Sequence, residues 1–146
     1  MKKKVLGIAS VLIASAISWA AISKSETTTV SGGVATASDP SGTALGIDIG
    51  RTTGFRLTIC AASGQTLSGG GEVKIWLYNS QATLWADNPS LKRSVTSSKR
   101  CEAFPDFDSS KIPINSSRVY AQPNGVSVSG GASVTVYYDA CQTTGC

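Results

Sequence analysis

The sequence of 146 residues contains no histidine, and only 15% of its residues are charged. The absence of histidine excludes every mechanism in which an imidazole acts as the base, including the activation of a serine or cysteine nucleophile. A zinc site needs close pairs of cysteines, or cysteines together with histidines, and neither pattern is present. We therefore expect a protein that is not an enzyme and that has no metal site and no cofactor.

The formal net charge of +4 comes mostly from the start of the chain. Residues 2–4 are lysines and supply three of the 13 cations, so residues 24–146 carry 10 cations against 9 anions, a net charge of +1. A nearly neutral domain has no general electrostatic field that attracts phosphates, so no nucleic-acid partner is expected. One local basic cluster is interpreted as a solvated loop: Lys92, Arg93, Lys99 and Arg100.

Residues 5–23 form an uncharged run of 19 residues between the first lysines and Lys24. A helix of this length rises about 28 Å, which matches the hydrocarbon core of a bilayer. The same run has the layout of a secretory signal, with lysines, an apolar stretch and small residues in order. We predict that residues 1–23 form a hydrophobic helix that is either a cleaved signal peptide or a retained membrane anchor. Both interpretations give the rest of the chain an extracytoplasmic location.

Residues 24–43 are polar, small and rich in glycine, without a sustained periodicity, and are predicted to be a flexible linker. From residue 44 onward apolar residues alternate with polar ones, which indicates strands with one buried face. The two clearest runs place six apolar side chains on buried faces: Phe55, Leu57, Ile59, Val73, Ile75 and Leu77. Residues 44–146 are therefore predicted to form a single all-β domain, a small β-sandwich or jelly roll.

Weaker strands are predicted over four short ranges bounded by turns: 83–86, 94–96, 101–104 and 118–121. Gly130 and Gly131 lie between the alternating runs 126–129 and 132–138. Because glycine supplies the positive φ angles of a two-residue turn, these runs are predicted to pair as a β-hairpin. The five prolines are predicted to lie in loops: Pro40, Pro89, Pro105, Pro113 and Pro123.

All four cysteines follow the hydrophobic segment, and an even number in a small exported domain indicates two disulfides. Three connectivities are possible. Cys141 and Cys146 are separated by only four residues and are suited to a local pair, which would leave Cys60 to pair with Cys101. The longer loop between Cys60 and Cys101 would constrain the unfolded chain more strongly.

The candidate binding or subunit-contact residues are aromatic: Trp76, Tyr78, Trp85 and Tyr137. Trp76 and Tyr78 alternate with the apolar run that begins at Val73, so they share the opposite face of that strand. Exposed aromatic side chains provide contact area for a protein or a stacking surface for a sugar. The alternative interpretation is that these rings pack in the core or under loops.

Two functions follow from these observations. The first is a structural or assembly subunit displayed on a cell surface, a filament or a virion, with the aromatic face used for subunit contacts. Its partners would be the membrane, through the N-terminal segment, and further copies of itself or other surface or virion proteins. The second is a secreted or periplasmic module that binds a glycan or a protein partner.

Overall fold

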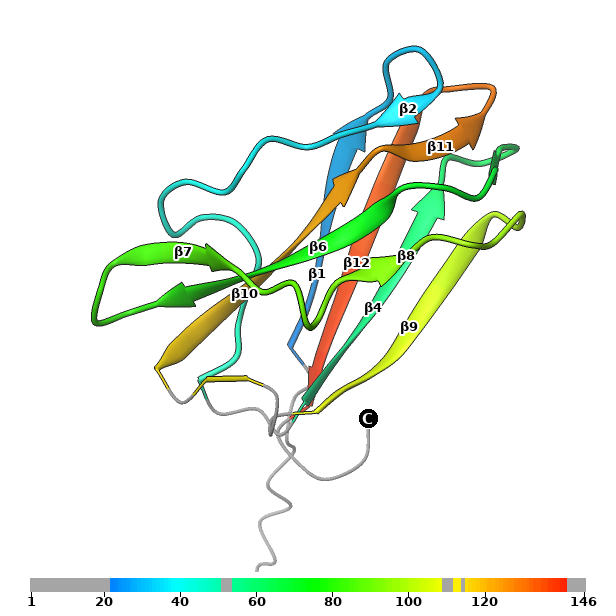
Figure 1. The fold of residues 1–146 in the computed structure, drawn as a ribbon. Coiled ribbons are helices and arrows are strands. Elements are labelled where there is room, and N and C mark those ends of the chain that lie inside the picture. The colour runs from blue at the N-terminus through cyan, green and yellow to red at the C-terminus, as the bar shows by residue number, and fades with distance from the viewer. Residues whose placement is uncertain (1–21, 51–53, 109–111, 114, 142–146) are drawn as a thin grey trace, which may run out of the picture.

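The computed structural model describes residues 22–50, 54–108, 112–113 and 115–141. Every regular element in these ranges is a β-strand (Figure 1), so the all-β prediction is confirmed. Two larger sheets face each other around one core, an arrangement consistent with a β-sandwich. Residues 1–21 of the predicted hydrophobic helix lie outside the described ranges, and the helix cannot extend to residue 23 because residues 22 and 23 begin a strand. Within the described ranges no helix has the length and apolar character to cross a membrane.

The first sheet contains four antiparallel strands, and its order is β1-β12-β4-β9. β1 spans Ile22–Thr29 and lies at one edge, beside β12 at Ser133–Cys141. β4 spans Gly54–Ala61 and separates β12 from β9, the other edge strand, at Cys101–Asp108. The side chains of β4 and β12 that face the second sheet are buried.

The second sheet has the order β3-β10-β6-β7. β3 is Ile47–Asp48, β10 is Ser116–Asn124, β6 is Glu72–Asn79 and β7 is Leu84–Asp87. β8, Arg93–Ser94, pairs with β6 beyond the end of β7. These strands overlap the weaker ranges predicted from the sequence, although β9 and β10 extend several residues further than expected.

A third, small sheet with the order β2-β11-β5 joins the two larger sheets at one end of the molecule (Figure 1). Its strands are β2 at Val34–Ala35, β11 at Val126–Ser129 and β5 at Thr66–Leu67. It contributes Ala35, Leu67 and two valines of β11 to the core. The small sheet therefore closes that end of the core.

Apart from the short β8, the two larger sheets contain eight strands, and these pair in a nested order. The first strand pairs with the last, β1 with β12, and the second pairs with the seventh, β3 with β10. The third pairs with the sixth, β4 with β9, and the fourth pairs with the fifth, β6 with β7. Pairing between β12 and β4 and between β10 and β6 then joins these pairs into the two sheets.

The six side chains predicted to be buried by their alternation are all inside the core: Phe55, Leu57, Ile59, Val73, Ile75 and Leu77. Their burial follows from the period of two, because every second side chain of a strand points to the same face. Phe55 stacks on Phe107 of β9, with ring centroids 4.6 Å apart. The core therefore draws on both large sheets.

The prediction of a flexible linker over residues 24–43 is wrong for residues 24–29, because these residues belong to β1. Eight residues of β1 pair in register with β12. The sequence conceals this strand because one of its faces is exposed and the other carries Lys24, Glu26 and Thr28 instead of apolar residues. Threonine favours strands even where no apolar alternation is present.

The predicted hairpin between residues 126–129 and 132–138 is also wrong. Both strands form, and Gly130 and Gly131 have φ angles of 84° and 45°, as a glycine turn requires. However, β11 pairs with β2 and β5, whereas β12 pairs with β1 and β4. The glycines allow the chain to change direction, but they do not determine which strands pair. The pairing is determined by burial of the valines of β11 and β12 against distant strands.

Two of the five prolines lie inside strands and not in loops. Pro105 is in β9, an edge strand, where the register with β4 shifts between Phe55 and Leu57. Pro123 is in β10, and its carbonyl accepts a hydrogen bond of 2.9 Å from the backbone N–H of Ala37. Edge positions and irregular positions tolerate proline because no ladder donor is needed there.

Candidate functional site

Three of the four predicted aromatic residues lie close together around a fourth ring, that of Tyr120. Tyr78 of β6 is directly opposite Trp85 of β7, with ring centroids 5.3 Å apart. Trp85 also meets the buried Tyr120 of β10 edge to face at 6.3 Å, and Tyr120 is directly opposite Trp76. We call Trp76, Tyr78, Trp85 and Tyr120 the aromatic cluster. The sequence analysis missed Tyr120, although its alternation within residues 118–121 placed it on the same face as Arg118.

Hydrogen bonds connect the aromatic cluster to the segment between β2 and β3. The indole N–H of Trp85 donates a hydrogen bond of 2.6 Å to the carbonyl of Gly42. The indole N–H of Trp76 donates to Oε1 of Gln122 at 2.7 Å, and Nε2 of Gln122 donates to the carbonyl of Ala37 at 2.7 Å. The two tryptophans are half-buried, so part of each ring is accessible. The indole N–H of Trp85 binds the loop directly, whereas that of Trp76 is connected to the loop through Gln122.

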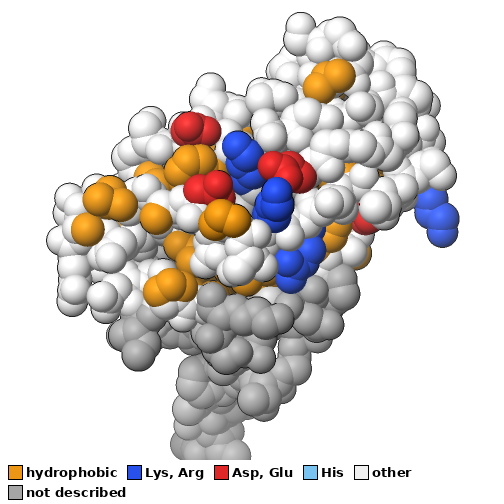
Figure 2. All heavy atoms as spheres, in the orientation of Figure 1, with side chains coloured by type: hydrophobic (Ala, Val, Ile, Leu, Met, Phe, Trp, Pro, Cys, Tyr) orange, Lys and Arg blue, Asp and Glu red, His pale blue; other side chains and the backbone are white. Residues whose placement is uncertain are grey.

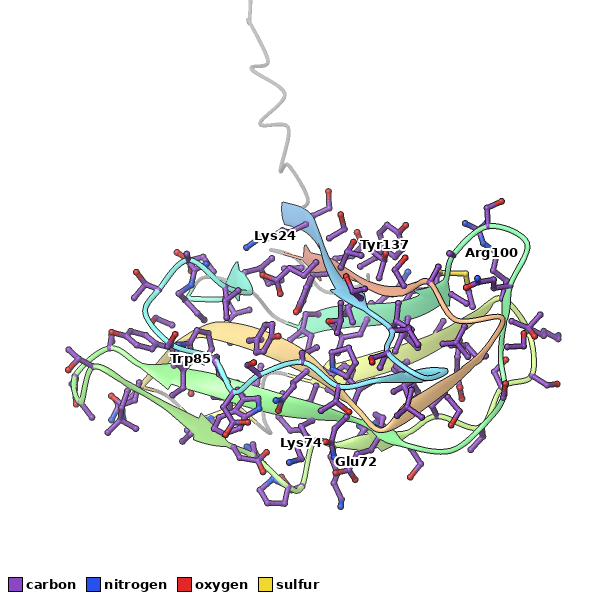
Figure 3. The ribbon with its side chains drawn as sticks, turned by 90° about the horizontal axis from the view of Figure 1, so that it is seen from above. Lys24, Glu72, Lys74, Trp85, Arg100 and Tyr137 are labelled. Atoms are coloured by element: carbon purple, nitrogen blue, oxygen red, sulfur yellow. A yellow bond between two sulfur atoms is a disulfide. The ribbon has the colours of Figure 1, made fainter. Side chains whose placement is uncertain are left out.

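Tyr137 lies apart from the cluster, on β12 of the other sheet (Figure 3). Its side chain is 42% exposed on the outer face of this sheet, the face opposite the core residues Val134 and Val136. Ser25 and Thr58 are its cross-strand neighbours. A shallow depression of about 300 Å³ beside the ring is lined by six residues: Ser23, Lys24, Ser25, Tyr137, Tyr138 and Asp139.

A partly buried polar network connects β1 to the rest of the domain through Glu26. One carboxylate oxygen accepts hydrogen bonds from the backbone N–H of Gly46 at 2.8 Å and from Nζ of Lys24 at 3.0 Å. The other oxygen accepts a bond of 2.7 Å from the hydroxyl of Tyr138. That hydroxyl also accepts a hydrogen bond from the backbone N–H of Ala121 at 3.0 Å. The sequence analysis missed this network because it assigned Lys24 and Glu26 to a linker.

The same network perturbs two tyrosines. Burial, followed by the negative charge of Glu26, raises the pKa of Tyr138 well above its ordinary value. Burial and Glu26 also raise the pKa of Tyr120 to about 12. Both hydroxyls are therefore neutral at neutral pH, and the hydroxyl of Tyr138 links β12 to β1 and β10.

Charged side chains of both signs are interspersed on the face shown in Figure 2. Nζ of Lys92 lies 3.0 Å from the carboxylate of Glu72, and this hydrogen bond lowers the pKa of Glu72. The guanidinium of Arg93 lies over the ring of Phe107 at 4.7 Å. Two members of the basic cluster thus have partners within the chain.

Cys60 of β4 and Cys101 of β9 form a disulfide, and the two residues are directly opposite each other in the ladder. This part of the predicted connectivity is confirmed. The side chain of Cys141 and the whole of Cys146 lie outside the described part of the chain. Within the described ranges no group of three or more histidine, cysteine or acidic side chains is placed to hold a metal ion.

These features give two accessible aromatic surfaces, on opposite sheets, and one partly buried polar network. Comparison with protein-family models, with curated proteins and with solved structures finds no match for this chain.

Proposed function

We propose that this protein is a non-enzymatic structural subunit that assembles on an extracytoplasmic surface, such as a cell surface, a filament or a virion. The observation that carries the proposal is the nested pairing of the eight strands in two four-stranded paths. This order supports the assignment of a jelly roll, an architecture that recurs in viral capsid proteins and in lectins. The step from architecture to role is an analogy at the level of the fold.

The position of β1 supports display at a membrane. The uncharged run ends at residue 23, and β1 begins at Ile22, so the jelly roll follows the hydrophobic segment without a spacer. Under this proposal the residues before β1 are a helical signal or anchor, and the membrane is one partner. The disulfide between Cys60 and Cys101 fits an oxidising, extracytoplasmic location.

Subunit contacts in this proposal use the accessible aromatic rings. Tyr137 presents its ring on one sheet, and Trp76, Tyr78 and Trp85 present half-buried rings on the other. Because the indole N–H groups of both tryptophans already have acceptors, their rings can be covered without leaving a donor unsatisfied.

Chemical cross-linking of the full-length protein in its native source tests the proposal. We expect a ladder of cross-linked species, and intact mass with the cysteines alkylated should show Cys60 and Cys101 to be oxidised. Replacement of Tyr137 or Trp85 by alanine should weaken the ladder if that surface is a subunit contact. A single cross-linked band of one chain, unchanged over a wide range of concentration, would rule out self-association.

A second candidate function is supported by the depression beside Tyr137, which suits a neutral glycan. An exposed ring supplies a stacking surface, and Ser25, Asp139 and Arg56 place hydroxyl, acceptor and donor groups on the same face. A glycan array probes this function directly. Binding that Tyr137→Ala removes and Tyr78→Ala preserves would favour the binding module, and an array without signal would exclude it for the glycans tested.

A further inference from the structure

We propose that β1 is exchanged between copies of this chain, so that Ile22–Thr29 of one copy pairs with β12 of a neighbouring copy. The inference rests on the proposed function, because it names a second copy as the partner and β1 as the element that connects the subunits. Exchange preserves every contact of the closed subunit, which makes it a low-cost route to assembly.

β1 is the strand of the first sheet that the apolar core holds least. It lies at the sheet edge and pairs with β12 alone. Its side chains on the core side are Lys24, Glu26 and Thr28, and its other face is exposed. The attachment of residues 23–29, whose side chains the structure describes, therefore consists of the backbone ladder and a polar network, and these seven residues bury no large apolar side chain.

The connection from β1 to β2 provides a hinge. It contains Gly32 and Gly33, with φ angles of 61° and 79°, between the buried Val30 and the first residue of β2. A side chain added at Gly32 would meet no atom within 4 Å, whereas the carbonyl of Gly33 accepts a hydrogen bond of 2.8 Å from the backbone N–H of Val128 in β11. Opening this turn breaks the hydrogen bonds between Ser31 and Val34 but leaves Gly33 attached to β11, and short hinge loops are recognised sites of exchange.

The site that β1 occupies selects this particular strand. Without β1, the backbone N–H of Gly46 would lose its acceptor, the carboxylate of Glu26, and the hydroxyl of Tyr138 would keep only the longer bond of 3.3 Å to the carbonyl of Ala121. Glu26 lies directly opposite Val136 of β12. An unrelated strand that paired with β12 in place of β1 would have to carry a carboxylate at the same position. Because an unsatisfied buried donor costs about 1–3 kcal/mol, the occupant that fits is β1 of another copy and not an unrelated strand.

Display at a membrane favours exchange between neighbours. β1 is the described strand nearest the hydrophobic segment, so anchored copies would hold their first strands at one height above the bilayer. Confinement to a surface raises the effective concentration of one copy's β1 around another copy's β12. The geometry therefore suits a chain of exchanged strands that runs parallel to the surface.

Paired single-cysteine variants test the exchange. The hydroxyl oxygens of Thr27 and Thr135 are 3.1 Å apart on directly opposite residues of β1 and β12. Full-length chains carrying Thr27→Cys and Thr135→Cys, each with a different tag, are co-expressed and oxidised. We expect a disulfide-linked heterodimer of twice the chain mass, with the linkage between residues 27 and 135 identified by peptide mass spectrometry.

The matched control pairs Thr27→Cys with Ala103→Cys. Ala103 is exposed on the same sheet, but its strand, β9, is separated from β12 by β4, so this pair should not cross-link. A Thr27→Cys/Thr135→Cys double variant should form the same disulfide within one chain or between chains.

The exchange would be overturned if the double variant forms the 27–135 disulfide within one chain and the co-expressed single variants form no such disulfide between chains. No linkage in any variant would also overturn it, because the opposition of residues 27 and 135 would then be wrong. If the chains nevertheless sediment as oligomers, the proposed function survives without exchange. If they sediment as monomers, both proposals fail.

Discussion

At the scale of single residues, the hydroxyl of Tyr138 is the group on which three parts of the domain depend. It donates to Glu26 of β1 and accepts from the backbone N–H of Ala121 in β10, while its ring is fully buried. Tyr138→Phe should lower the free energy of unfolding by about 2 kcal/mol, because a carboxylate and a backbone donor both lose a buried partner. Urea unfolding measures this change.

Tyr137→Phe is the matched control, since Tyr137 is the preceding residue, points to the opposite face and is exposed. Its free energy of unfolding should stay within about 0.5 kcal/mol of that of the unmodified protein. Equal effects of the two substitutions would show that the hydroxyl of Tyr138 is not a stabilising group.

The raised pKa values of Tyr138 and Tyr120 predict a loss of stability at alkaline pH. An unfolded tyrosine ionises near pH 10. Because folding raises these pKa values, the stabilisation is fully present below about pH 10 and is lost as the pH rises through the folded values. The free energy of unfolding should therefore fall above about pH 10, and by less in Tyr138→Phe.

Tyrosinate absorbance during an alkaline titration provides the measurement. We expect part of the absorbance change to occur over the same pH range as unfolding, which is monitored by circular dichroism. Ionisation of all four tyrosines in one step near pH 10, with the fold intact, would contradict the partly buried network around Glu26.

At the scale of elements, the loop between β2 and β3 is held at Gly46. Gly46 has a φ angle of 67°, and a side-chain carbon there would overlap the carbonyl of Val119 in β10. Gly42, in the same loop, has a φ angle of 64° but open space around it. Gly42→Ala should cost about 1 kcal/mol for the left-handed backbone, and Gly46→Ala should cost clearly more because the loop must also move.

Thermal or urea unfolding of the two glycine variants compares them directly. The indole of Trp85, which is hydrogen-bonded to Gly42, provides a fluorescence signal from the same loop. Equal losses of stability in the two variants would mean that Gly46 is not in close contact with β10.

The disulfide between β4 and β9 is a second feature at this scale. It closes a loop with a sequence separation of 41 between Cys60 and Cys101. A loop of that length predicts a loss of about 4 kcal/mol when both cysteines are replaced by serine, as the unfolded chain gains freedom. Equilibrium unfolding of Cys60→Ser/Cys101→Ser gives the value, and an unchanged midpoint would show that the bond contributes nothing to stability.

Several elements could be predicted from the sequence because their signals are local. The alternation around Leu57 and Ile75 identifies β4 and β6, since each strand has one apolar face. β1 shows no such alternation, because Lys24 and Glu26 take core-side positions. Their partners are distant in the sequence: Ala44, Gly46 and Tyr138. A strand whose buried face is polar can be recognised only once its distant partners are known.

At the scale of the whole molecule, strand pairing is the part that the sequence did not reveal. Gly130 and Gly131 favour a turn, but the strands on either side belong to different sheets, and β12 pairs with β1 at the other end of the chain. Such contacts depend on burial across the entire core and not on local turn chemistry. The candidate aromatic residues were visible in the sequence, whereas their division between two sheets was not.

The proposed function requires self-assembly, and sedimentation velocity of the full-length protein over a wide range of concentration measures it. We expect species of two or more chain masses whose share grows with concentration and falls when Tyr137 or Trp85 is replaced by alanine. A single species of one chain mass at every concentration, with and without a cross-linker, would show that the protein is not an assembly subunit.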